Sequence, residues 1–180
     1  MPQGPKVVRK TAGLAIVALL CGSHLRVAAQ AQSQLAVSTP ERKIHLTFTL
    51  HGETKRELEQ SLDECKSVEV RYIAELRKQR MLWPDLSFAR TTIRNRAACD
   101  ASSQSRTLQR MVDGSIVAST STVNQATVLA FMSETCDVAA FQDVTFPSYS
   151  YSVRVKSVLV AAPERTRETD VLAHARFEIR

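Results

Sequence analysis

Two histidines, His45 and His51, carry side chains that could bind a metal ion or transfer a proton. They lie in the stretch IHLTFTLHGETKRELEQ, where apolar and polar residues alternate as in a strand with one buried face. On such a strand the two histidines share a face, but their Cα atoms are separated by about 20 Å, too far for one metal ion or one proton relay. His174 could supply a partner only if the last strand lay beside the first. We therefore interpret the histidines as solvated strand residues.

The rest of the chain contains no motif that predicts catalysis. A GxSxG nucleophile elbow, a glycine-rich phosphate loop and a CxxC pair are all missing from the sequence. Cysteines and histidines are not grouped at zinc-ligand spacing, and the acidic residues are concentrated in one charged segment. We therefore predict a protein that is not an enzyme and that has no catalytic residues, no cofactor and no metal site.

Residues 1–31 have the layout of a secretory signal peptide. Three basic residues precede an apolar run over 12–21, and the small-residue stretch Ala29-Gln30-Ala31 follows. The apolar run has about ten residues, whereas a membrane-spanning helix needs roughly 20. Cleavage is expected before Gln32 or Gln30.

This reading predicts a periplasmic or secreted protein with no transmembrane segment in the mature chain. Cys21 is preceded by Leu20 rather than by a small residue, so a lipoprotein is not expected. Residues 32–42 are predicted to be a short flexible N-terminus. Residues 43–180 suit a single domain with a sizeable core.

Three cysteines remain after the predicted cleavage: Cys65, Cys99 and Cys136. An exported chain meets oxidising conditions, so one internal disulfide is expected. Three pairings are possible, and the spacing alone does not choose among them. Cys65 lies on the apolar face of a predicted helix, where buried packing is the expected role. By elimination, Cys99 and Cys136 are our choice for the bridge.

Removing the signal also changes the charge balance. Four of the 24 Lys and Arg residues precede residue 32, which leaves 20 against 18 acidic residues and gives little reason to expect nucleic acid as a partner. One window stands out, because it holds five arginines with only Asp100 against them: Arg90, Arg94, Arg96, Arg106 and Arg110. A solvated basic edge is the favoured interpretation, and a patch for a polyanion or for lipid headgroups is the alternative.

Periodicity predicts the first elements. A strand over 44–50 ends at Gly52, and a long amphipathic helix follows over 53–80. Its apolar residues recur at steps of three and four: Leu58, Leu62, Cys65, Val68, Tyr72 and Leu76. A dimeric coiled coil is the competing view, but the repeat lasts under three heptads.

A second strand is predicted over 86–93, and an exposed polar excursion over 95–106 ends in a helical turn near Leu108. Asp113-Gly114 is a strong turn signal before a strand over 115–123, which is expected to lie beside the 86–93 strand. Asn124 is a good N-cap for a short helix that closes near residue 136.

The C-terminal part is predicted to be extended at 144–146, 149–156 and 173–179, with a loop over 163–170. Tyr149 and Tyr151 point to the same side of their strand, so they are either core residues, which is the favoured reading, or a subunit contact. The element order predicts an α+β domain: a mixed or antiparallel sheet with one long and one short helix packed on one face.

The order of elements resembles the SIMPL domain of exported bacterial proteins. The similarity lies in HLTFTLHGETKRELEQ, ELRKQRMLWPDLSFARTTI, DGSIVASTSTVNQATVLAFMSE with VTFPSYS, and the closing VLAHARFEIR. The family has a glycine-bearing strand before the first of these and an alanine-rich helix late in the chain, and neither has a clear copy here. The resemblance implies a periplasmic or outer-surface protein that is often oligomeric and is connected, in some members, with oxidative-stress tolerance or antigenicity.

Two functional hypotheses follow. The first is a non-enzymatic envelope protein that acts by self-assembly, through sheet edges formed by the first or last strand, or by binding the envelope. In this case the partner is a second copy of the chain or an envelope protein. The alternative is an accessory subunit of a secretion, conjugation or adhesion apparatus, which contacts an acidic partner through the arginine window, residues 90–110.

Overall fold

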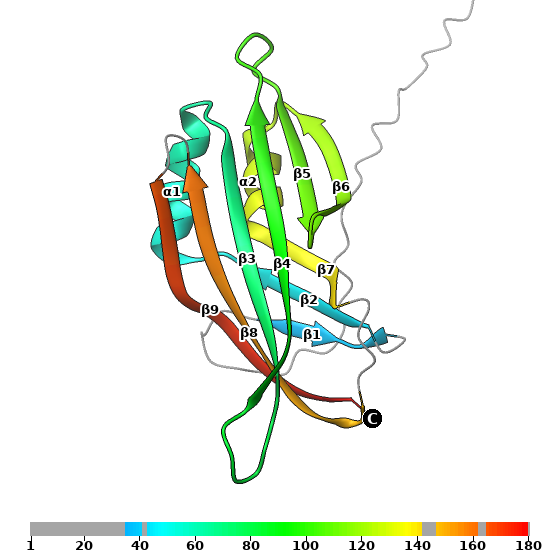
Figure 1. The fold of residues 1–180 in the computed structure, drawn as a ribbon. Helices are drawn as coiled ribbons and strands as arrows, with labels where there is room; N and C mark the ends of the chain where they lie inside the picture. Colours follow the sequence, from blue (N-terminus) through cyan, green and yellow to red (C-terminus); the bar gives the residue numbers. More distant parts are fainter. Residues whose placement is uncertain (1–34, 41–42, 142–146, 162–164, 180) are drawn as a thin grey trace, which may run out of the picture.

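The computed structural model describes residues 35–40, 43–141, 147–161 and 165–179, and they form two antiparallel sheets and two helices (Figure 1). The predicted signal peptide and the extended segment predicted at 144–146 lie outside the described residues. The helices are α1 (Gly52–Asp63) and α2 (Gln125–Ser133). The strands are β1 (Ala36–Ser38), β2 (Ile44–Thr49), β3 (Val68–Lys78), β4 (Leu86–Cys99), β5 (Arg106–Val112), β6 (Ser115–Thr122), β7 (Glu134–Phe141), β8 (Tyr149–Ala161) and β9 (Arg165–Ile179).

The larger sheet has six strands in the order β6-β5-β4-β3-β8-β9, and the smaller has three in the order β1-β2-β7. Both helices and the small sheet lie behind the large sheet in Figure 1, and the helices contact each other as well as β3. The large sheet therefore has one face covered by the rest of the chain and one face turned outward. The predicted α+β class holds in its coarse form, with antiparallel strand pairing.

The predicted long helix is wrong beyond Asp63. The chain leaves α1 through Cys65, which has a positive φ of 50°, and then forms β3. Val68, Tyr72 and Leu76 are spaced by four, and that spacing fits one face of a helix as well as one face of a strand. Because Val70 and Ala74 are buried between them, the period over this segment is two. The segment pairs with β4 on one side and with β8 on the other, and this pairing makes it a strand.

The arginine-rich part of the chain is also more extended than predicted. β4 continues to Cys99, so only residues 100–105 form the polar excursion, and β5 replaces the predicted helical turn. β4 pairs with β5 rather than with β6, which places Ile93 opposite Val112. Consequently β5 lies between the two strands that were expected to be neighbours.

Two local predictions are confirmed. Asp113 and Gly114 form the tight turn between β5 and β6, with positive φ values of 47° and 91° that a two-residue hairpin turn favours. Asn124 caps α2, and its side-chain oxygen accepts a hydrogen bond from the Thr127 backbone N–H at 3.1 Å. These signals are local in sequence, which explains why they can be read without knowledge of strand pairing.

The ends of the chain differ from the prediction. β1, within the segment expected to be flexible, pairs with β2 and belongs to the small sheet. The predicted loop over 163–170 is strand from residue 165, where β9 pairs with β8. The 44–50 strand is confirmed as β2, but β2 lies between β1 and β7 and is not a sheet edge.

The core lies between the covered face of the large sheet and the elements behind it. It contains the apolar residues of β2, the inward-facing residues of β3 (Val68, Val70, Tyr72, Ala74 and Leu76) and Leu58 and Leu62 of α1, all of them buried. Phe48 meets Tyr72 edge to face at 4.9 Å between ring centroids. Burial of each such large side chain is worth roughly 1.5–3 kcal/mol, and this fixes the orientation of the large sheet.

Candidate functional site

The five arginines of the 90–110 window do not form one patch, because the structure divides them between the two faces of the large sheet. Arg90, Arg94 and Arg96 on β4 are exposed on the outward face. The residues of β4 that alternate with them point to the covered face and are buried. Arg106 and Arg110 on β5 point to the covered face, toward the helices. The window therefore contributes three cations to the surface and two to the interior.

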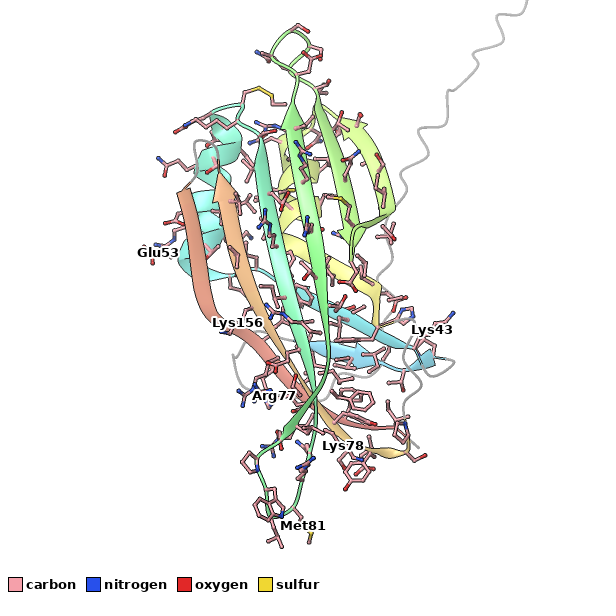
Figure 2. The ribbon with its side chains drawn as sticks, in the orientation of Figure 1. Lys43, Glu53, Arg77, Lys78, Met81 and Lys156 are labelled. Carbon is pink, nitrogen blue, oxygen red and sulfur yellow. A yellow bond between two sulfur atoms is a disulfide. The ribbon has the colours of Figure 1, made fainter. Side chains whose placement is uncertain are left out.

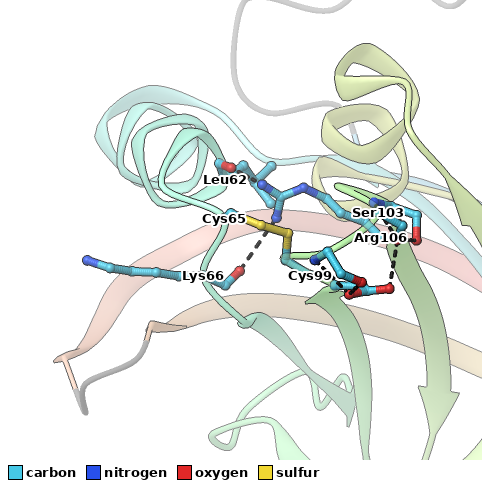
Figure 3. The surroundings of a disulfide bond; sticks show 9 residues. Leu62, Cys65, Lys66, Cys99, Ser103 and Arg106 are labelled. Atoms are coloured by element: carbon cyan, nitrogen blue, oxygen red, sulfur yellow. Dashed lines mark hydrogen bonds between the residues drawn. A yellow bond between two sulfur atoms is a disulfide. The ribbon is translucent and has the colours of Figure 1, made fainter.

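Arg106 is 6% exposed and holds the end of α1 (Figure 3). Its guanidinium donates hydrogen bonds to the backbone carbonyls of Leu62 and Lys66. Burial lowers the pKa of Arg106, and the charge of Asp63 acts in the opposite direction. The last turn of α1 has no basic residue of its own, so Arg106 supplies the positive charge that a helix C-terminus favours.

Arg110 has the same role at the end of α2. It donates to the carbonyls of Phe131 at 2.9 Å and Glu134 at 2.6 Å, and its guanidinium lies 4.8 Å from the centre of the Phe131 ring. Tyr72 and Asn95 also donate to carbonyls in the last turn of α2. α2 likewise has no basic residue in its last turn. Both inward arginines are therefore structural caps, supplied to the two helices by one strand.

The predicted Cys99–Cys136 bridge is wrong, because the disulfide joins Cys65 to Cys99 (Figure 3). Cys65 is exposed at the turn after α1 and does not pack in a helix face as predicted. The bridge links this turn to the end of β4, beside Arg106. Cys136 on β7 retains its thiol and is half-buried. A disulfide is compatible with an extracellular location.

The histidines are in separate places. His45 Nδ1 lies 3.0 Å from Asp137 Oδ1, and Asp137, on the neighbouring strand β7, is at a positive φ of 48°. His174 is on β9 in the other sheet, opposite Arg154 of β8, so the strand of His174 does not pair with β2, the strand of His45. Among the described residues, no three His, Cys, Asp or Glu side chains are grouped as a metal site would require.

The two tyrosines of β8 also differ in environment. Tyr151 is fully buried, stacks with Phe177 and meets Phe88 edge to face, so it is a core residue and not a subunit contact. Tyr149 is 46% exposed, with the Lys78 ammonium 3.8 Å above its ring. Only Tyr149 is therefore placed where it could meet a partner.

The outward face of the large sheet is strongly basic. Among the side chains that the structure describes, eight Arg and Lys lie on it: Arg71 and Arg77 of β3, Arg90, Arg94 and Arg96 of β4, Arg154 and Lys156 of β8, and Arg176 of β9. The described acids at the same face are Glu69 and Glu75 of β3, Glu178 of β9, and Asp85, whose Oδ2 lies 3.5 Å from Ser152 Oγ. We call these eight cations the basic face; with the four acids counted, the excess among the described side chains is four positive charges.

Strand pairing places one pair of like charges and two pairs of opposite charges between β3 and β4. Arg94 lies directly opposite Arg71, and such a pair of like charges is unfavourable. Glu69 lies opposite Arg96, and Glu75 lies between Arg90 on one side and Arg154 on the other. The two glutamates also bind Arg71 and Arg77 of their own strand, at 2.5 and 3.1 Å, so each carboxylate is shared by more than one arginine.

Two titrating groups report the resulting positive potential. Although burial acts to raise the pKa of Glu75, hydrogen bonds from Arg77 and Ser87 and the charges of Arg77 and Arg154 hold it below its usual value. The pKa of His174 is lowered by burial and by the charges of Arg154 and Arg176, against the opposing charge of Asp85. The nearby cations contribute to both shifts in the direction expected of positive charge.

No family model, no curated protein and no solved structure matches the chain. The resemblance to the SIMPL domain therefore stays a prediction. Within the described part of the chain, neither helix has the length and apolar composition needed to cross a membrane.

The sequence points to three of the eight cations, Arg90, Arg94 and Arg96. Arg71 and Arg77 lie in the segment predicted as a helix over 53–80, which is β3 in the structure. Arg154 and Lys156 lie in the strand predicted over 149–156 and Arg176 in the strand predicted over 173–179, but the sequence does not give the neighbours of these strands. The signal that could have joined them is the alternation of charged with apolar residues in EVRYIAELRK, residues 69–78, which is typical of a strand with one wet face.

Proposed function

We propose that this protein is an exported, non-catalytic binding protein of the cell envelope, whose basic face binds an anionic partner. The proposal rests on one observation: eight cations against four acids among the described side chains of one sheet face, with Arg71 and Arg94 directly opposite each other. An anion between these two side chains would offset their repulsion. Binding would therefore offset an unfavourable interaction between like charges that is present in the free protein.

The spread of the charges suggests the kind of ligand. The cations lie on β4, β3, β8 and β9, which are neighbours in the sheet and are spaced by about 4.8 Å. A patch across four strands fits an extended array of anions better than a single small ion. Phosphate or carboxylate groups repeated along a polymer or a surface have this character.

Binding to dextran sulfate, a soluble polyanion, would test the proposal, with neutral dextran as the reference. We expect affinity for dextran sulfate to fall steeply as salt is raised, because screening weakens each contact. The double variant Arg71→Glu/Arg94→Glu should bind at least about tenfold more weakly than the native protein.

The matched control is Arg56→Glu/Lys55→Glu on α1, which changes the net charge equally but lies away from the basic face. An equal loss of affinity in this control would show that net charge, rather than the basic face, governs binding. Affinity that is insensitive to salt would also contradict the proposal.

Self-association is a second candidate, supported by the exposure of β6. This strand is an edge of the large sheet, and its Ile116 and Val117 are 59% and 48% exposed. An uncovered edge offers backbone groups to another strand, and exposed apolar residues would add to such pairing. Light scattering at micromolar concentration tests this candidate, and a strictly monomeric protein would contradict it. Ile116→Lys should reduce any assembly that is seen.

A further inference from the structure

The β3–β4 hairpin ends in an exposed apolar tip. Met81, Leu82 and Trp83 are 99%, 89% and 73% exposed, and they are consecutive. The two strands project beyond the rest of the sheet, with Met81 at the lower extreme of the molecule in Figure 2. Large apolar residues so exposed and so close together mark a surface that meets something other than water.

Cations adjoin this tip. Lys78 and Arg80 precede it directly, and Arg77 of the basic face is the next cation along β3. Figure 2 shows Arg77 and Lys78 where the hairpin leaves the sheet. Pro84 follows Trp83 and restricts the backbone of the loop. Inward from the apolar tip the chain is therefore basic on the β3 side, and Asp85 follows Pro84 on the β4 side.

We propose that the tip, residues 81–83, inserts into an anionic lipid bilayer while the neighbouring cations contact its headgroups. This inference rests on the proposed function and names its partner as a lipid surface. Tryptophan favours the boundary between headgroups and acyl chains, and Lys and Arg favour anionic headgroups just outside it. An apolar tip that includes Trp83, with cations on its inward side, matches that order of layers.

A protein partner fits the tip less well. A stable protein interface buries about 800 Å² on each partner, and three residues at the end of a narrow hairpin supply only part of that area. A projecting tip would need a matching cavity in a partner, whereas a bilayer accepts any apolar tip that reaches its acyl chains. The basic face adds the charge complementarity that selects an anionic bilayer.

Trp83 is the only tryptophan of the chain, so its fluorescence reports on the tip alone. Vesicles of phosphatidylcholine and vesicles that also contain phosphatidylglycerol would be added to the purified protein. With the anionic vesicles we expect co-sedimentation, a blue shift of Trp83 emission, and quenching by lipids brominated on their acyl chains. With neutral vesicles we expect at least about tenfold weaker binding.

The variant Met81→Ser/Leu82→Ser should lose at least about tenfold in affinity for anionic vesicles but keep its affinity for dextran sulfate. Its control is Val123→Ser, which removes an apolar side chain that is 75% exposed on a different part of the surface. This control should bind vesicles as the native protein does. Arg71→Glu/Arg94→Glu should weaken the binding of both ligands.

These readouts separate the two proposals. Salt-sensitive binding to vesicles with unchanged Trp83 emission and no quenching would overturn insertion and leave the basic face as the binding site. Binding to dextran sulfate without any binding to anionic vesicles would do the same. If the native protein did not bind dextran sulfate, the proposed function itself would be overturned.

Discussion

Arg110 Nε donates a hydrogen bond to Asn95 Oδ1 at 2.8 Å, across the paired strands β5 and β4. Both side chains also donate to the carbonyl of Phe131 at the end of α2. On its other face β4 presents Arg94 and Arg96 to solvent. Neighbouring residues of β4 therefore have different roles. Asn95 belongs to an interior polar network that holds α2, whereas Arg94 and Arg96 lie on a surface that can bind a ligand.

Removal of Arg110 should destabilise the fold. Arg110→Ala leaves the carbonyls of Phe131 and Glu134 and the Oδ1 atom of Asn95 without this donor, so we expect a loss of about 2–4 kcal/mol in the free energy of unfolding. Arg110→Lys should recover only part of the loss, because an ammonium cannot reproduce the fork of donors. Urea unfolding followed by circular dichroism measures both. A loss below about 0.5 kcal/mol for Arg110→Ala would contradict the capping role.

Substitution of Arg94 should raise the stability of the fold and weaken ligand binding, whereas substitution of Arg110 should lower the stability. Arg94→Glu places an acid opposite Arg71, so we expect the protein to gain about 0.2–1 kcal/mol in stability. The same change should weaken binding to dextran sulfate, because it removes a cation from the centre of the basic face. Urea unfolding and a binding titration on the one variant check both effects. A variant that is less stable and binds normally would show that Arg94 has a structural role instead.

The disulfide should contribute more stability than any other single link between α1 and β4. It closes a segment with a sequence separation of 34, for which loop entropy predicts about 4 kcal/mol. Cys65→Ser/Cys99→Ser should therefore lower the Tm strongly, and a reductant should have no further effect on this variant. Cys136→Ser is the control, and it should keep the reductant sensitivity of the native protein. Peptide mapping after alkylation would contradict the pairing if Cys136 were found linked to Cys99.

How far the sequence predicts this fold depends on the range of each signal. Asn124 and Asp113-Gly114 act within four residues, and both were read correctly. Val68, Tyr72 and Leu76 fit two periods at once, and only pairing with β4 and β8 assigns them to a strand. The sequence does not predict the basic face for the same reason. Its cations come from four strands, and whether they lie side by side depends on the register of strand pairing. The sequence also does not separate Arg106 and Arg110 from the surface arginines, because an arginine that caps a helix carries the same charge as an exposed one.

The pKa of His174 offers a direct measurement of the potential on the basic face. Burial and the charges of Arg154 and Arg176 lower it below 6.5, so folding disfavours protonation of this ring. The stability linked to His174 is therefore fully present above pH 6.5 and is lost as pH falls from that value through the lower folded pKa. Proton NMR of the ring should show a pKa below 6.5 that rises when Arg154 is replaced by Gln. Dextran sulfate should raise it as well, because a bound polyanion offsets the nearby cations. A pKa at or above 6.5 in the free protein, or one that dextran sulfate leaves unchanged, would contradict the placement of the ligand on this face.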